Sequence, residues 1–151
     1  MTDNTKIYTD IYETLYSSLD YHKSDSIYTT HYSNFIPNTL VKWKVKFNSV
    51  LDIGCSHGEG LKYLKDMGKE VYGIDISETA VKRAQTKGIN AKVCSATKID
   101  YPDSFVDLVI STDVIEHLFP EDIEKVYREA YRISKKYILF NISNTPEGNK
   151  Y

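Results

Sequence analysis

Residues 50–60 have the composition that a cofactor-binding loop needs. The segment reads VLDIGCSHGEG, an apolar run that contains Asp52 and leads into a loop with three glycines. Glycines let backbone N–H groups approach a ligand without a Cβ in the way, and a helix that begins near Glu59 would point its positive end at the same place. Another apolar run ends at Asp75, 23 residues after Asp52, and an acid at such an offset suits ribose hydroxyls. The spacing predicts a site for a nucleoside-bearing cofactor, with an empty glycine turn as the alternative.

Asp113, Glu116 and His117 form a second group of side chains that could take part in chemistry. If a helical turn begins at residue 113, all three lie on one face. Two carboxylates and an imidazole can hold a divalent cation, and His117 alone could act as a general base near neutral pH. The alternative is an acid–imidazole pair without a metal. His57, in the glycine loop, is expected to face solvent.

The elements that must position these residues follow from the periodicity of the apolar side chains. Apolar and tyrosine residues recur every four positions over 7–19, which predicts an amphipathic helix. Residues 20–34 are polar and indicate a loop or lid, and a helix is favoured over 38–44. Beyond these, the sequence predicts strands at 50–53, 70–74, 91–94, 106–111 and 137–142, and helices at 59–67, 77–87 and 120–133. This alternation predicts the α/β class with a doubly wound, mostly parallel sheet.

Composition limits the partners and the setting. The 151 residues suffice for one domain, and the net charge of −2 provides no overall basic field for a nucleic acid. Three lysines surround Trp43, and we expect them to cover a buried tryptophan. The two cysteines cannot form a disulfide framework or a four-ligand zinc site. No apolar run approaches the roughly 20 residues of a membrane helix, so a cytoplasmic protein without a membrane partner is expected.

Three motifs resemble those of class I S-adenosylmethionine-dependent methyltransferases of the small-molecule type. They are VLDIGCxxGxG at 50–60, VYGIDIS at 71–77 and DLVISxDVIEHL at 107–118. The resemblance covers residues 49–142 and implies a Rossmann-like core with the strand order 3-2-1-4-5-7-6, from which we expect strands 6 and 7 to be missing here. It also implies N-terminal helices and a lid over residues 1–48, packed on a cofactor-binding core over 49–151 within a single domain.

The resemblance also implies which residues contact S-adenosylmethionine. Asp52 and the loop backbone would surround its methionine half, Asp75 would hold the ribose hydroxyls, and Ile76 would pack on the adenine. Ser95 stands where the family often has an aspartate that binds the adenine amino group, and Ser56 replaces a frequent glycine. The full set of implied cofactor-binding residues is Asp52, Gly54, Cys55, Ser56, Gly58, Asp75, Ile76, Ser95, Ala96 and Thr112.

The expected activity is methyl transfer to a small-molecule acceptor, with His117 as the candidate catalytic residue. Ser111–Val114 replaces the Asn-Pro-Pro-Tyr-like motif that serves nucleobase nitrogens in this family, which argues against that acceptor. One alternative is metal-assisted O-methylation of an RNA end or a quinone-type phenol, with Asp113, Glu116 and His117 as ligands. Another is a cofactor-binding module without catalytic activity. The apolar segment 137–142 forms a sheet edge in this scheme, and we expect it to permit a homodimer.

Overall fold

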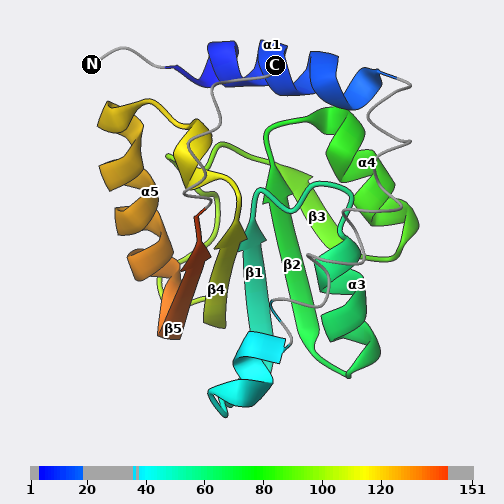
Figure 1. Ribbon diagram of the computed structural model, residues 1–151, viewed down its shortest axis with the longest axis vertical. Coiled ribbons are helices and arrows are strands. Elements are labelled where there is room, and N and C mark those ends of the chain that lie inside the picture. Colours follow the sequence, from blue (N-terminus) through cyan, green and yellow to red (C-terminus); the bar gives the residue numbers. More distant parts are fainter. Residues whose placement is uncertain (1–3, 19–35, 37, 143–151) are drawn as a thin grey trace.

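The computed structural model describes residues 4–18, 36 and 38–142, and its centre is a five-stranded parallel sheet (Figure 1). The strands are β1 (Ser49–Ile53), β2 (Glu70–Asp75), β3 (Asn90–Val93), β4 (Val106–Thr112) and β5 (Ser134–Asn141). Their order in the sheet is β3-β2-β1-β4-β5, and every neighbouring pair is parallel. This confirms the predicted fold class and the order 3-2-1-4-5.

Helices cover both faces of the sheet. They are α1 (Thr5–Ser17), α3 (Glu59–Asp66), α4 (Glu78–Thr86) and α5 (Pro120–Ile133), with a short 3-10 helix, η1 (Ile115–His117), and a helical stretch at 38–42. Leu61 of α3 and Val81 of α4 join one apolar cluster, whereas Val126 of α5 joins the cluster on the opposite face. Because β1 and β4 lie between these layers, they are buried at almost every position.

The strand order predicts a crevice at the carboxyl edge of the sheet, beyond the ends of β1 and β4. The chain moves from β1 outward to β2 and β3, and then returns to β4 on the other side of β1. Parallel sheets of this kind bind ligands where the order reverses, beyond the carboxyl ends of the strands. Helix α1 runs across that edge, from the start of α5 to the start of α4 (Figure 1).

The predicted N-terminal helix is confirmed, and its tyrosines rather than its isoleucines face the core. Tyr8 and Tyr16 are buried, whereas Ile7 and Ile11 are 46% and 56% exposed. The predicted loop or lid at 20–34 lies outside the described residues. Within the described part of the chain, no helix has both the length and the apolar character that crossing a membrane requires.

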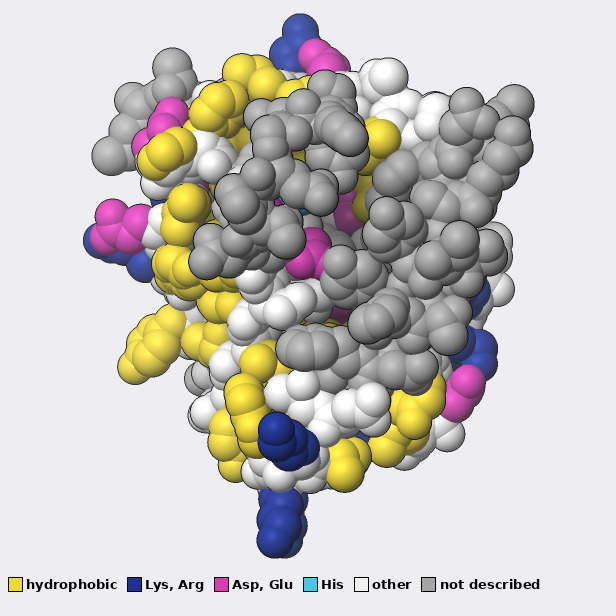
Figure 2. All heavy atoms as spheres, viewed as in Figure 1, with side chains coloured by type: hydrophobic (Ala, Val, Ile, Leu, Met, Phe, Trp, Pro, Cys, Tyr) yellow, Lys and Arg dark blue, Asp and Glu magenta, His cyan; other side chains and the backbone are white. Residues whose placement is uncertain are grey.

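The prediction of a buried Trp43 is wrong, because this side chain is 62% exposed. The helical stretch ends at residue 42, and a turn with Lys44 at φ 55° follows it. Leu40 and Phe47 point into the core on either side of the turn, which leaves Trp43 on its outer side. Basic side chains project from this end of the molecule, at the amino edge of the sheet (Figure 2).

Candidate active site

The glycine loop between β1 and α3 is held against the end of β2. The amides of Gly54 and Cys55 both donate to the carbonyl oxygen of Ile74, at 2.8 and 2.9 Å. Gly54 has φ +77°, and a Cβ there would lie 2.3 Å from Cγ2 of Val114, in the loop that follows β4. Glycine at 54 is therefore required both by the backbone conformation and by close contact between the two loops.

Ser56 occupies a left-handed conformation with φ 49°, although it is not a glycine. Its amide donates to Oδ2 of Asp75 at 2.9 Å.

The other two glycines of the motif differ in their roles. Gly58 caps α3 with φ 76°. Gly60 lies within α3, and a Cβ there would meet no atom within 4 Å, so the third glycine of the motif has no steric role in this structure.

Asp52 and Asp75 bring two carboxyl groups to the crevice. Oδ1 of Asp52 is buried and forms no hydrogen bond with any described residue. Burial, together with the charge of Asp75, raises the pKa of Asp52 to about 8. Asp75 is 6% exposed, and burial raises its pKa as well. Its two oxygens accept the amides of Ser56 and Ser77, and the Ile76 amide also acts on the carboxylate.

The remaining predicted cofactor residues also follow the carboxyl ends of strands. Ile76 comes directly after β2, Ser95 and Ala96 follow β3, and Thr112 is the last residue of β4. The Ser95 hydroxyl lies 2.9 Å from that of Thr97 and accepts the Thr97 amide at 3.3 Å. The structure therefore places all of the predicted residues at one edge of the sheet.

The helical turn expected from residue 113 is wrong. Asp113 has φ 54°, and its amide continues the sheet by donating to the carbonyl oxygen of Asn141 at 3.0 Å. A helical conformation starts only in η1. Burial and the neighbouring Glu116 carboxylate raise the pKa of Asp113 to about 6. Among the described residues, no three metal-ligating side chains come together as a possible ion site, so the predicted ligand face is not formed.

Three tyrosines of α1 form a stripe over the loops of the crevice, and sequence analysis did not assign them to the site. Tyr8 packs on Phe119, with ring centroids 5.6 Å apart, and Tyr12 lies 6.5 Å from the ring of His117. Tyr16 lies 5.1 Å from the ring of His57. Their spacing of four residues is the signal that could have found them, since such residues share one helix face.

His57 does not face solvent, contrary to expectation. Its side chain is 4% exposed because Tyr16 covers it. Nε2 of His57 lies 3.3 Å from Nη1 of Arg83 in α4. The imidazole therefore fills the space between the glycine loop, α1 and α4.

Comparison with known proteins decides the family. A model described as "Methyltransferase domain" matches residues 51–139, more than half of the chain. The chain belongs to the class I S-adenosylmethionine-dependent methyltransferase family. This confirms the resemblance that the three motifs indicated.

Relatives of this chain include a probable S-adenosylmethionine-dependent methyltransferase of Mycolicibacterium smegmatis, 30% identical over 62% of this chain and 37% of the relative. Ajmaline N-methyltransferase of Rauvolfia serpentina is 38% identical over 59% of this chain and 33% of the relative. A solved Pyrococcus horikoshii protein superposes with a TM-score of 0.69 at 28% identity, covering 93% of this chain and 60% of that one. The chain thus spans about a third of the length of the curated relatives it matches.

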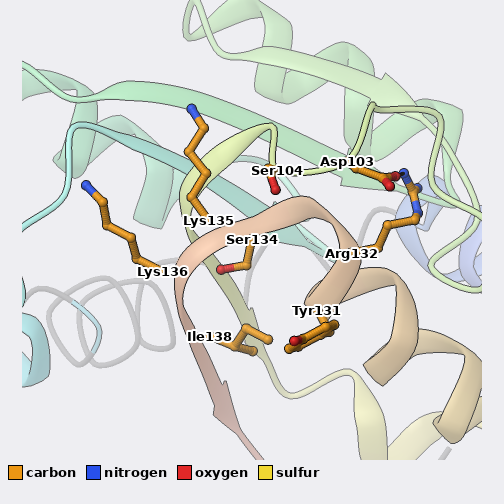
Figure 3. Close-up of a pocket in the computed structure, with 8 residues that line it drawn as sticks. All are labelled: Asp103, Ser104, Tyr131, Arg132, Ser134, Lys135, Lys136 and Ile138. Carbon is orange, nitrogen blue, oxygen red and sulfur yellow. Dashed lines mark hydrogen bonds and ion pairs between the residues drawn. The ribbon is translucent and has the colours of Figure 1, made fainter.

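A hollow of about 650 Å³ lies at the amino edge of the sheet, where α5 leads into β5 (Figure 3). Tyr131 and Ile138 line one side of it, and Arg132 lies beside Asp103 on another. The Arg132 guanidinium is occupied there, because it donates to Asp103 at 2.9 Å and to Glu129. None of the residues of the three motifs that were predicted to bind the cofactor lines this hollow.

Proposed function

We propose that this chain binds S-adenosylmethionine in the carboxyl-edge crevice and transfers its methyl group to a small-molecule acceptor. The observation that carries the proposal is the pair formed by Asp52 and Asp75. A buried carboxyl oxygen without a hydrogen-bond partner is costly, and Asp52 Oδ1 is such an atom. A ligand with an ammonium group and ribose hydroxyls would supply partners to both acids, so the residues fit this cofactor.

Each motif residue has a defined part in the proposed complex. Asp52 accepts from the amino group of the cofactor, and Asp75 holds the two ribose hydroxyls. Ile76 packs on the adenine, and the backbone that follows β3 and β4 completes the walls. The loop residues whose backbone borders the methionine half are Gly54, Cys55, Ser56 and Gly58; the residues that line the adenine side and the end of β4 are Ser95, Ala96 and Thr112.

The acceptor would lie between the loop after β4 and helix α1. When bound, the cofactor supplies a methyl group already activated by the positive sulfonium, so the chain has mainly to align the acceptor. Tyr12 and His117 face one another there, with Asp113 two residues before η1. His117 is the candidate group to accept a proton from the nucleophile.

A small-molecule acceptor is the better supported of the substrate classes considered. The name of the Rauvolfia relative specifies N-methylation of ajmaline. Metal-assisted O-methylation would need Asp113, Glu116 and His117 as a ligand set, and the described residues contain no such group of possible metal ligands. A binding module without turnover stays as an outcome of the test below.

The decisive experiment is calorimetric titration of the protein with S-adenosylmethionine and with S-adenosylhomocysteine. Asp75→Ala should abolish micromolar binding of both. Asp100→Ala is the matched control, because its carboxylate is 96% exposed and lies outside the crevice, and it should leave the affinity unchanged. A folded protein that binds neither compound would contradict the proposal. Binding without methylation of any acceptor in a panel followed by mass spectrometry would indicate a non-catalytic module.

We further propose that two copies associate through β5, the edge strand beyond β4. Tyr137, Ile138 and Ile142 are about two-fifths exposed on this strand and just after it, and an exposed apolar edge invites strand pairing. Sedimentation velocity should show a dimer for the native protein and a monomer for Ile138→Lys. A monomer at every concentration of the native protein would contradict the proposed dimer.

The expected cytoplasmic setting also remains a proposal, supported by two free cysteines.

A further inference from the structure

Helix α1 contributes a carboxylate that belongs to none of the cofactor motifs. Oε2 of Glu13 accepts a hydrogen bond from the Ser77 hydroxyl at 2.6 Å and from the Thr79 amide at 3.3 Å. Its other oxygen, Oε1, accepts from the Thr79 hydroxyl. These bonds, led by the one from Ser77, lower the pKa of Glu13. An ionised acid from the start of the chain is thus fixed at the positive end of α4.

Ser77 connects this carboxylate to the cofactor crevice. Its hydroxyl caps α4 by accepting the Ala80 amide at 3.2 Å, and its own amide donates to Oδ1 of Asp75 at 3.0 Å. The second oxygen of Asp75 accepts the Ser56 amide in the glycine loop. The side chain of Ser77 is fully buried, so the connection is shielded from water. Glu13, Ser77, Asp75 and Ser56 therefore form one continuous series of contacts.

This arrangement has an electrostatic cost in the absence of a ligand. Burial is the main cause of the raised pKa of Asp75, and the charge of Glu13 raises it further. A neutral capping residue would avoid this repulsion. A ligand that gives hydrogen bonds to Asp75 and brings positive charge to the crevice would offset the repulsion between the two carboxylates. Glu13 should therefore be accommodated better in the ligand-bound protein than in the free one.

The other end of α1 is held independently. Tyr8 donates to Oδ2 of Asp122 in α5 at 2.9 Å, and the side-chain amide of Asn4 donates to the same oxygen at 3.0 Å. Tyr8 and Glu13 are five residues apart in α1, about 8 Å along the helix axis. Helices α5 and α4, which they contact, lie under opposite ends of α1 (Figure 1). Loss of the Glu13 contacts would release α1 at α4 while the α5 end stays attached.

We infer that Glu13 is a positioning residue of the cofactor site: through Ser77 it orients Asp75 and the glycine loop, so that the seating of α1 and cofactor binding favour one another. The inference rests on the proposed function for its cofactor, whereas the contacts among the four residues are present without it. Glu13 touches neither the loop nor, in the proposed complex, the cofactor. Its effect on affinity is therefore indirect.

Hydrogen exchange of the ligand-free protein tests the coupling without relying on cofactor binding. Glu13→Ala should speed exchange at the amides of Ser77 and Ser56, because both amides donate hydrogen bonds to the Asp75 carboxylate. Asp10→Ala removes the same charge from an exposed position of α1 and should leave both amides unchanged. Faster exchange at Thr79 alone would overturn the inference, because Glu13 would then be only a helix cap.

Titration with S-adenosylmethionine tests the consequence for binding. Glu13→Ala should weaken binding about tenfold, with Asp10→Ala close to the native value. Glu13→Gln keeps an amide oxygen that can accept from Ser77, so it should recover most of the affinity. A Gln variant as weak as Ala would overturn the positioning role in favour of charge alone. If the native protein binds no cofactor, the proposed function fails, and the exchange result still decides the coupling.

Discussion

Tyr8 and Asp122 are 114 residues apart in the sequence, and they join the first helix to the helix that precedes the last strand. The Tyr8 hydroxyl donates to Oδ2 of Asp122 at 2.9 Å and accepts the Phe119 amide at 2.8 Å. Burial is the main cause that raises the pKa of Tyr8 to about 12, so the phenol stays protonated and can donate at any physiological pH. One hydroxyl thereby satisfies two partly or fully buried groups.

Replacing Tyr8 by Phe should therefore destabilise the protein. The ring is retained, but the Phe119 amide and the Asp122 carboxylate each lose a partner, and the free energy of unfolding should fall by about 1–3 kcal/mol. Urea denaturation followed by circular dichroism measures the change. Tyr131→Phe is the control, because Tyr131 is 79% exposed and its variant should unfold like the native protein. Equal midpoints for both variants would contradict the prediction.

Two glycines of the first motif should respond oppositely to alanine. At Gly54 a Cβ collides with Val114, and the backbone is left-handed, so Gly54→Ala should destabilise the protein by at least about 2 kcal/mol. At Gly60 nothing lies near the added Cβ and the residue is helical, so Gly60→Ala should stabilise it by up to about 1 kcal/mol. Thermal unfolding of the two variants in parallel decides this, and a loss of similar size at both positions would refute it.

The affinity for S-adenosylmethionine should depend on pH through Asp52. The Asp52 pKa of about 8 means that its carboxyl is protonated below pH 8 in the free protein, and the cofactor ammonium must then displace that proton. The native protein should therefore gain affinity as pH rises and level off above pH 8. Asp52→Asn lacks this gain, so the ratio of variant to native Kd should rise about tenfold per pH unit between pH 6 and pH 8.

The amino group of the cofactor titrates in the same pH range. Its titration affects the Kd of the native protein and of Asp52→Asn equally, so the ratio of the two Kd values removes this contribution. Calorimetry in buffers of different ionisation enthalpy should also show proton release for the native protein at pH 7. Asp52→Asn should show less release. A Kd ratio that does not change with pH would contradict the role of Asp52.

Asp113→Asn should stabilise the protein above pH 6 and leave it unchanged below pH 4. The folded-state pKa of Asp113 is raised to about 6, so its ionisation on going to neutral pH disfavours the folded state. Allowing for partial solvent screening, the gain should be roughly 1 kcal/mol at pH 7.5. Asparagine also tolerates the left-handed backbone. Urea unfolding at pH 7.5 and pH 4 tests the sign, and a gain that persists at pH 4 would show that another effect is responsible.

The sequence predicted the sheet well because its strands are apolar runs between clear turn residues. The start of β5 was the exception, because the strand begins three residues before the predicted range of 137–142. These three residues, Ser134, Lys135 and Lys136, are polar and extend the strand beside the beginning of β4. Side-chain periodicity carries no information on such pairing. The helix predicted over 77–87, by contrast, matches α4 to within one residue at each end. Its start depends on local chemistry, because the Ser77 side chain caps the helix.

The errors at the site have a common cause. His57 looked like a solvent-facing loop residue because the tyrosine that covers it lies 41 positions earlier in the chain. The left-handed backbone at Asp113 is set by the contact of its amide with Asn141, which no local pattern reveals. The contacts of Glu13 were not predicted for the same reason, since its partners Ser77 and Thr79 lie more than 60 residues away in the sequence. Motifs located the acids of the crevice, whereas the contacts that orient them are long-range.

The exposed Trp43 determines how this protein can be studied by optical methods. It is the single tryptophan of the chain and is exposed in the turn that precedes β1, at the amino edge of the sheet and away from the crevice. Its emission in the folded state should therefore resemble that of an unfolded chain, and it should change little when a ligand enters the crevice. Tryptophan fluorescence would report neither unfolding nor binding, so a probe attached near α1, or the near-ultraviolet signal of its tyrosines, is the informative alternative.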